Sequence, residues 1–370
     1  MRAKIFFRQL FKFILIAAFI ASIFIYPNWY KKQWHKVQGM YCVAQGDKYL
    51  RKAKFQKAIN EYKKGLELYP EHYGAWFNLG NLYVVYEDYY SAIDAYTNAI
   101  KHNPNYVIAR MNYGIISAEK LGDFDGAIEQ YDKIIGIRRK LVYIPFVFNN
   151  LRSYKTNIGL AYYNKGVAYR QKSTYMDNRH EEKQAYLLQA IKAYQEASKI
   201  LKKDYDTHYN LALAYHINGN YNLAGLTYCK AIEYGPLNYE AHYNLAVLLN
   251  HLKYYKEALN ELYKANTLVM SRAEAGENQQ KYMFNVMNDV TKEILKDESG
   301  AKYLTEDFLN DRTKTGTDIK LIRSKAKEKG EDLDKAFYEE MQACDARSIF
   351  RDEDNPEDED PTEELEDYGE

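Results

Sequence analysis

Two stretches of this chain align residue for residue without a gap, although they lie far apart. Residues 75–104 read AWFNLGNLYVVYEDYYSAIDAYTNAIKHNP, and residues 207–236 read THYNLALAYHINGNYNLAGLTYCKAIEYGP. Each stretch carries apolar and small residues at helical spacing in two successive segments and ends in proline. One helix pair cannot bury its apolar surface alone, so it must stack on further copies of itself. The repetition therefore predicts an all-α array of stacked helix pairs.

The spacing within one copy is specific. On the first helix and then the second, the patterned positions are Trp76, Leu79, Gly80, Tyr83, Ala92, Tyr96 and Ala99, with Pro104 at the end. Small residues such as Gly80 and Ala92 allow the two helices to approach closely. The motif W-x2-L-G-x2-Y…A-x3-[FY]-x2-A…P resembles the tetratricopeptide repeat (TPR) family. This resemblance implies a right-handed α-solenoid whose first helices line a concave face.

Further copies recur at or near a 34-residue period. We expect about six TPR helix pairs over residues 39–272, and the third has one extra residue before Ala127. The expected repeats lie near residues 39–72, 73–106, 107–141, 159–204, 205–238 and 239–272. The family resemblance therefore covers most of the chain.

The N-terminal residues 1–36 have the pattern of a transmembrane signal anchor. Residues 13–30 hold no charge over 18 residues, which is about 27 Å of helix and close to the thickness of a bilayer's hydrocarbon core. A cleaved signal peptide is the alternative, because basic residues precede this run. No small-x-small cleavage site follows it, so we expect an uncleaved single-pass anchor.

Charge is distributed unevenly near this segment. Residues 1–64 carry 14 Lys and Arg against 2 Asp and Glu, although the whole chain has a net charge of zero. Basic residues flank both ends of the apolar run, and we expect the N-terminus inside and the repeats on the extracytoplasmic side. Attraction to anionic lipid accounts for this basic region better than nucleic-acid binding does.

Two segments interrupt the repeat pattern. Residues 137–155 contain the apolar run LVYIPFVF with Pro145, which we interpret either as an extension packed on the third repeat or as an exposed patch for a partner or bilayer. The polar residues 171–183 are expected to form a solvated spacer within the fourth repeat.

The repeat pattern fades in the last hundred residues. We expect a helical region at residues 273–350, with helices over 272–296 and 318–350 that cap the array. Residues 351–370 hold 12 acidic residues against Arg351 alone and are expected to be a disordered acidic tail.

The sequence offers little support for catalysis. It contains no phosphate-binding loop, HExxH, GxSxG or paired-cysteine motif. Cys42, Cys229 and Cys344 are few and far apart, which argues against a disulfide framework and a zinc site. His208 and His242 recur, but both occupy the tryptophan position of their repeats and are interpreted as packing residues. We therefore expect no enzyme activity, cofactor or metal.

The concave groove is the remaining candidate site. An asparagine stands two residues after the tryptophan position in five of the six repeats, and an aromatic residue or methionine precedes each one. The asparagine row is Asn78, Asn112, Asn164, Asn210 and Asn244, and the aromatic row is Phe77, Met111, Tyr163, Tyr209 and Tyr243. Asparagine both donates and accepts, so the row suits the backbone of an extended peptide. Alternatively, each asparagine ties one helix to the next.

These observations favour a membrane-tethered scaffold that binds a protein or peptide partner and assists assembly of a membrane or envelope complex. Some cytosolic co-chaperones of the family clamp a carboxylate with basic groove residues. Here the equivalent positions are apolar or asparagine, which argues against that ligand class. The alternative is an enzyme, or an enzyme subunit, completed by the C-terminal helices. The groove could also be filled by the chain's own residues 318–350.

Overall fold

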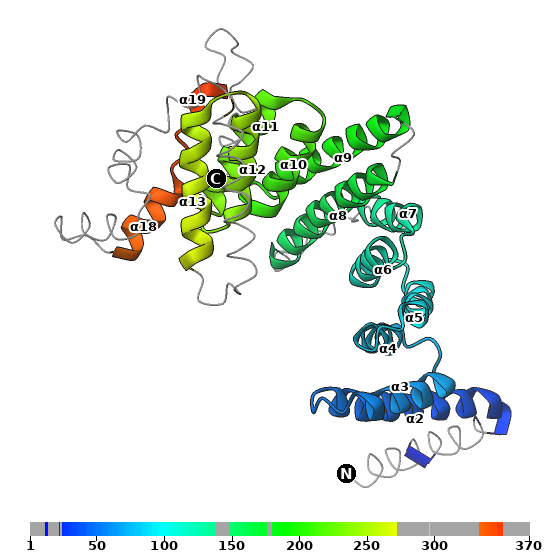
Figure 1. Cartoon of the computed structure of the whole chain (residues 1–370). Helices are drawn as coiled ribbons and strands as arrows, with labels where there is room; N and C mark the ends of the chain where they lie inside the picture. The colour runs from blue at the N-terminus through cyan, green and yellow to red at the C-terminus, as the bar shows by residue number, and fades with distance from the viewer. Residues whose placement is uncertain are drawn as a thin grey trace, which may run out of the picture. The chain divides into compact units, whose positions relative to one another are not determined.

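Helices are the regular elements of the part of the chain that the structure, a computed structural model, describes (Figure 1). It describes residues 24–137, 148–175, 180–271 and 333–350, together with Lys12, Phe13, Ser22 and Lys296, and no strand occurs among them. The chain divides into two units, residues 1–138 and 139–370. The all-α architecture expected from the repeats is confirmed.

Between residues 27 and 135, the first unit forms three helix pairs. Its helices are α2 (Pro27–Leu50), α3 (Phe55–Leu68), α4 (Tyr73–Val85), α5 (Tyr89–His102), α6 (Val107–Lys120) and α7 (Phe124–Ile135). The expected boundary between an anchor ending at residue 36 and a first repeat beginning at 39 falls inside α2, which is continuous. The extra residue of the third repeat lengthens its first helix, because α6 has 14 residues where α4 has 13.

The described residues of the second unit form three more pairs and two shorter helices. The pairs are α8 (Phe148–Thr174) with α9 (His180–Ile200), α10 (Tyr205–Ile217) with α11 (Tyr221–Tyr234), and α12 (Tyr239–His251) with α13 (Tyr255–Ser271). The shorter helices are α18 (Leu333–Gln342) and α19 (Arg347–Phe350). The long helices α8 and α9 extend far into the segment 171–183, so the spacer predicted there is much shorter.

Within a pair, a tyrosine of the second helix lies against a glycine of the first. A Cβ atom added to Gly80 would come within 2.6 Å of the Tyr96 ring, and the Tyr96 side chain is only 1% exposed. The same contact recurs in three other pairs, namely Gly46 with Tyr62, Gly114 with Tyr131 and Gly166 with Tyr194. Glycine is therefore required at these positions because the tyrosine ring occupies the space of a side chain.

The turns inside the pairs also repeat. One residue with positive φ stands in the turn of five of the described pairs: Ala53, Glu87, Gly122, Gly219 and Lys253. Asparagine or aspartate side chains are favoured before the following helix because they accept hydrogen bonds from its free N–H groups. Asp88 and Asp123 do this for α5 and α7, at 3.2 Å from the Ser91 amide and 2.9 Å from the Gly126 amide.

Several expectations fall largely outside the described residues. Only Phe13, Ser22 and residues 24–30 of the predicted membrane span are described, and its last four residues begin α2. Among the described residues, no helix combines the length and the apolar character needed to cross a bilayer. Most of the apolar run near Pro145, the predicted helix 272–296 and the acidic tail 351–370 likewise lie outside the described residues.

Candidate functional site

The asparagine row of the first unit links neighbouring helix pairs. The Asn78 side-chain amide donates to Asp47 Oδ1 at 3.3 Å and to the Tyr62 hydroxyl at 3.2 Å, both in the preceding pair. Asn112 donates to Asn81 Oδ1 at 3.0 Å, and that oxygen also accepts the Tyr96 hydroxyl at 2.8 Å. Each tie runs from a first helix to the pair before it.

The second unit repeats this arrangement with tyrosine acceptors. Asn210 donates to the Tyr163 hydroxyl at 3.1 Å, and Asn244 donates to the Tyr209 hydroxyl at 2.9 Å. Both asparagines also donate to a backbone carbonyl one turn earlier in their own helix. Asn164 lies on α8 at the corresponding position. In the second unit, two tyrosines of the aromatic row thus accept hydrogen bonds from the asparagine row.

These hydrogen bonds show that the row ties successive first helices together, which was the alternative to peptide binding. A peptide-binding role for the same residues stays a prediction. The tie has a consequence for any ligand, because it holds the side chains in fixed positions before a partner arrives. Preorganised polar groups lose less freedom on binding than mobile ones do.

The aromatic row is half-buried and built from ring contacts. The Phe77 ring lies 5.2 Å from the Tyr106 ring, and the Tyr163 ring lies 5.9 Å from that of Tyr194. The Tyr209 ring stacks on Tyr205 at 5.6 Å. Met111 lies on α6 and Tyr243 on α12, both half-buried. The row therefore offers apolar surface at positions fixed by packing.

A hollow of about 300 Å³ lies between α4, α5 and α6 in the first unit. It is lined by Asn81, Val84, Tyr96, Asn112, Ile115 and Ile116. Two side-chain amides in an otherwise apolar lining suit a peptide, since the amides orient its backbone and the apolar wall receives a side chain. A second hollow, of about 360 Å³, lies near Trp76 and Tyr83.

The tyrosines of these helices act as neutral hydrogen-bonding groups. Burial raises the pKa of Tyr96, and burial together with the hydrogen bond to Asp47 raises the pKa of Tyr62. Burial likewise raises the pKa of Tyr209, with a smaller contribution from Glu240. All three phenols stay protonated at neutral pH, so these tyrosines contribute hydrogen bonds and apolar rings but no phenolate charge.

A buried ionic cluster in the last repeat was missed by the sequence reasoning. His242 Nδ1 lies 2.6 Å from Glu261 Oε2, and Lys264 Nζ lies 3.6 Å from Glu261 Oε1. The three side chains are at most 1% exposed. Burial raises the pKa of the Glu261 carboxyl, but Lys264 and His242 outweigh burial and hold the pKa below its usual range. The i,i+3 spacing of Glu261 and Lys264 is visible in the sequence, but their burial is not.

Both recurring histidines are buried, which confirms their interpretation as packing residues. The His208 ring packs edge-on against Tyr234 with centroids 4.9 Å apart, whereas His242 adds a hydrogen bond to Glu261 to its packing role. The His242, Glu261 and Lys264 side chains are buried, and Lys264 also pairs with the exposed Asp345 at 3.7 Å. Among the residues that the structure describes, no three His, Cys, Asp or Glu side chains are placed to hold a metal ion.

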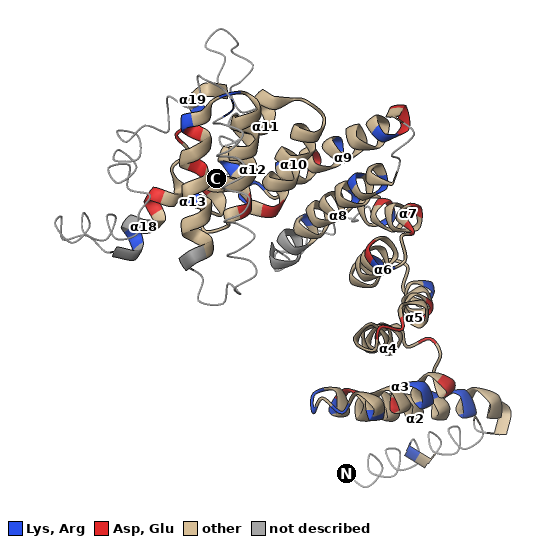
Figure 2. Cartoon of the chain, in the orientation of Figure 1, with Lys and Arg blue, Asp and Glu red and all other residues tan. Residues whose placement is uncertain are grey.

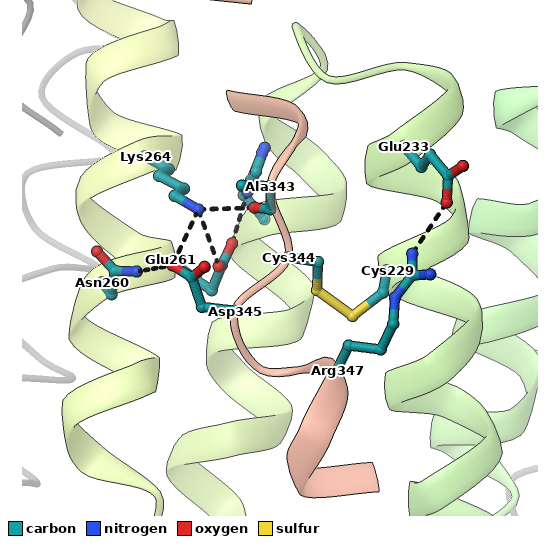
Figure 3. Close-up of a disulfide and its surroundings, with 10 residues drawn as sticks. Cys229, Glu233, Asn260, Glu261, Lys264, Ala343, Cys344, Asp345 and Arg347 are labelled. Atoms are coloured by element: carbon teal, nitrogen blue, oxygen red, sulfur yellow. Dashed lines mark hydrogen bonds and ion pairs between the residues drawn. A yellow bond between two sulfur atoms is a disulfide. The ribbon is translucent and has the colours of Figure 1, made fainter. Parts of the chain in front are cut away.

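The expectation about cysteine is wrong for one pair. Cys229 of α11 and Cys344, between α18 and α19, form a disulfide across 115 residues of sequence (Figure 3). Sparse cysteines argue against a framework of several disulfides, but spacing says nothing about one bond between residues brought together by tertiary folding. Cys42 is free.

The described part of the C-terminal region does not cover the asparagine and aromatic rows. Residues 341–350 lie on α11 and α13, the second helices of the last two pairs, and their hydrogen bonds go to Glu233, Asn260 and Lys264 (Figure 3). The alternative that residues 318–350 fill the groove is therefore wrong for this described portion. Residues 341–350 instead cover the second helices α11 and α13.

Family models for the tetratricopeptide repeat match residues 43–85, 73–106, 205–236 and 227–266. The chain contains tetratricopeptide repeats. Proteins built from these repeats are generally interaction scaffolds without enzyme activity, and the repeats make this chain a scaffold for protein–protein interaction. The matched ranges include the two stretches whose alignment first indicated the repeat.

One curated relative is BBSome complex member BBS4 from Bos taurus, which is 27% identical over 231 residues. The match covers 60% of this chain and 38% of the relative, so the chain spans well under half of that protein.

Similar solved structures include PilW, a widely conserved type IV pilus biogenesis factor, at 14% identity and a TM-score of 0.47, with 66% of this chain and 98% of that chain covered. Another is Pseudomonas aeruginosa PilF, at 14% identity and a TM-score of 0.46, with 68% and 99% covered. YrrB, a TPR protein with an unusual peptide-binding site, is 19% identical with a TM-score of 0.39, and the match covers 54% of this chain and 88% of that one. Because every TM-score lies below 0.5, none of these structures bears on the function of this chain.

Proposed function

We propose that this protein is a membrane-tethered scaffold that binds an extended peptide segment of a partner protein on the first helices of its repeats. The hollow between α4, α5 and α6 carries this proposal, because it combines the amides of Asn81 and Asn112 with an apolar wall that includes Ile115. These are first-helix positions of adjacent repeats. An extended peptide can bond to the amides through its backbone and place a side chain against the wall.

The scaffold's role is to hold its partner while a membrane or envelope complex assembles. Holding two proteins at one surface raises their effective concentration without new contacts between them. The description of the bovine relative as a member of a complex supports a role of this kind. An enzyme is the less favoured alternative, since the side chains of the ionic cluster, His242, Glu261 and Lys264, are at most 1% exposed.

Three features support the membrane tether and its orientation. The last four residues of the apolar run 13–30 are the first residues of α2, whose Trp29 and Trp34 are 56% and 62% exposed. Lysines accompany these aromatic residues, and Figure 2 marks Lys and Arg positions in blue along the ribbon of α2 and α3. Aromatic and basic residues together suit the interface of an anionic bilayer. The disulfide supports an extracytoplasmic position for the repeats, because disulfides persist in oxidising compartments.

The groove is tested with peptides that are selected from a random display library for binding to the detergent-solubilised full chain. Replacing Ile115 with Asp places a charge in the hollow, and replacing Tyr209 and Tyr243 together with Ala removes part of the aromatic row. We expect each variant to bind its groove-selected peptides at least about tenfold more weakly, because buried anchors can each contribute over 1 kcal/mol. Tyr90→Asp, on the second helix α5 and 76% exposed, is the matched control.

Membrane attachment is tested separately in cells. We expect the full-length chain to stay in the membrane fraction after alkaline carbonate washing, and a reporter fused after Glu370 to be active only on the extracytoplasmic side. Recovery of a soluble, shortened product would show a cleaved signal peptide. A reporter active in the cytoplasm would refute the orientation and leave the groove proposal untouched.

A further inference from the structure

Residues 341–350, here called the strap, pass between α11 and α13 (Figure 3). These two helices are the second helices of the last two repeats. On the α11 side, Cys344 is bonded to Cys229, and Arg347 pairs with the Glu233 carboxylate at 2.9 Å. Gln342 also donates to the Glu233 backbone carbonyl at 3.0 Å. The strap therefore has covalent, ionic and backbone ties to a single helix.

Helix α13 recognises the strap from the other side. Lys264 donates to the backbone carbonyl of Ala343 at 2.7 Å, and Asn260 donates to Asp345 at 3.1 Å (Figure 3). Lys264 is almost fully buried and belongs to the ionic cluster with Glu261. A backbone carbonyl of the strap is thus part of the polar environment that makes burial of this lysine tolerable.

Apolar residues anchor both ends of the strap. Met341 is fully buried and packs with Leu268 of α13. At the other end, Phe350 is 1% exposed, and its ring lies over Gly225 of α11 so closely that a Cβ atom there would collide with it. The outer helices therefore bind this segment as they would bind a short peptide, with two apolar anchors and one recognised carbonyl.

The disulfide differs from the other ties in strength and in chemistry. The side chains of Arg347 and Glu233 are 37% and 43% exposed, and that of Asp345 is 65% exposed. Ion pairs this exposed contribute little to holding two segments together. A covalent bond removes the detached states altogether, and its Cys229 end is completely buried. The disulfide is thus the one tie of the described strap that a reductant breaks.

We propose that the Cys229–Cys344 disulfide is a redox latch that keeps the strap closed over α11 and α13, and that its reduction uncovers a second docking surface for a strap-like peptide. A dithiol reductant supplies two electrons and two protons. The sulfur–sulfur bond breaks, two thiols form, and the dithiol becomes a disulfide. The surface lies on second helices, so it is distinct from the groove assigned to the first helices.

Hydrogen exchange on the full chain, with and without dithiothreitol, tests the latch. The informative amides are those of Ala343, Arg347 and Ile349, which all donate hydrogen bonds within the C-terminal region. We expect reduction to accelerate their exchange at least about tenfold, since detachment becomes possible. Cys344→Ser should exchange at the reduced rate without any reductant. Cys42→Ser should behave as the unmodified chain, because Cys42 is not in the disulfide.

A synthetic peptide of residues 333–350 with serine at position 344 probes the uncovered surface. We expect it to bind the reduced chain and the Cys344→Ser variant, and to bind the oxidised chain at least about tenfold more weakly. Peptides selected for the first-helix groove should bind the oxidised and reduced chains alike, which keeps this test separate from the groove proposal.

Three results would overturn the latch. Unchanged strap exchange after complete reduction would show that noncovalent contacts alone hold it. Faster exchange throughout α10 and α12 would show that the bond supports the repeats themselves. A disulfide-linked dimer on a nonreducing gel would show that the strap is exchanged between two copies of the chain.

Discussion

Replacing Lys264 with Met is expected to lower the free energy of unfolding by about 3–5 kcal/mol, because removing one partner leaves a buried charge uncompensated. Lys264 is the nearest cation to Glu261 Oε1, at 3.6 Å, and both side chains are 1% exposed. The substitution also removes the donor to the Ala343 carbonyl. Urea denaturation of the full chain, followed by circular dichroism, measures the loss.

The pH dependence separates this mechanism from a packing defect. In the native protein, the pKa of Glu261 is lowered. The ionised Glu261 carboxylate therefore stabilises the fold at pH values above the ordinary carboxyl pKa, and this stabilisation is lost as the pH falls through the lowered pKa of the folded state. Without Lys264, the strongest influence lowering that pKa is gone and burial favours the protonated acid. The gap in stability between the two proteins should therefore narrow on acidification.

Lys256→Met is the matched control for this prediction. Lys256 lies on the same helix, α13, and is exposed. Its replacement should change the free energy of unfolding by no more than about 0.5 kcal/mol. A Lys264→Met effect no larger than that of the control, or a gap that stays constant between neutral and acid pH, would refute the role given to the buried cluster.

Replacing Tyr96 with Ala is expected to cost about 3–5 kcal/mol, because it removes a large buried ring and leaves a cavity beside Gly80. The hydroxyl is lost too, and with it one of the two hydrogen bonds accepted by Asn81 Oδ1. Urea denaturation gives the magnitude. Hydrogen exchange should place the loss in α4, α5 and α6, and leave the second unit unaffected, since repeat arrays are stabilised by near-neighbour contacts.

Tyr90→Ala serves as its control, because Tyr90 lies on the same helix, α5, and is 76% exposed. We expect this substitution to change stability by no more than about 0.5 kcal/mol. Equal losses from the two substitutions would mean that the repeating contact between glycine and tyrosine does not hold the pairs together.

The helix pairs could be predicted from sequence because their determinants are local. Gly80 and Tyr96 stand 16 residues apart, as do Gly46 and Tyr62. Inserted residues lengthen this separation to 17 for Gly114 and Tyr131 and to 28 for Gly166 and Tyr194. Helical periodicity then indicates which side chains face one another. The extra residue in the third repeat was predictable for the same reason, and it appears as a one-residue extension of α6.

The contacts of the strap were not predictable, because they depend on tertiary folding between residues far apart in sequence. Cys229 and Cys344 are separated by 115 residues, and no spacing rule relates them. Lys264 looks like an ordinary surface lysine on an amphipathic helix until the strap covers it. The same limit applied to the asparagine row. The positions of the asparagines could be read from the sequence, but their hydrogen-bond acceptors, such as Asp47 for Asn78, could be identified only from the structure.

The most direct test of the central claim is a pair of dissociation constants for one library-selected peptide, measured on the full chain with stability checked for every variant. If partners bind on the first helices, Ile115→Asp should weaken binding at least about tenfold, while Tyr90→Asp on α5 should leave it within about twofold. Equal losses in the two variants, or full affinity in Ile115→Asp and in the Tyr209→Ala, Tyr243→Ala double variant, would contradict the claim that the first-helix groove is the binding site.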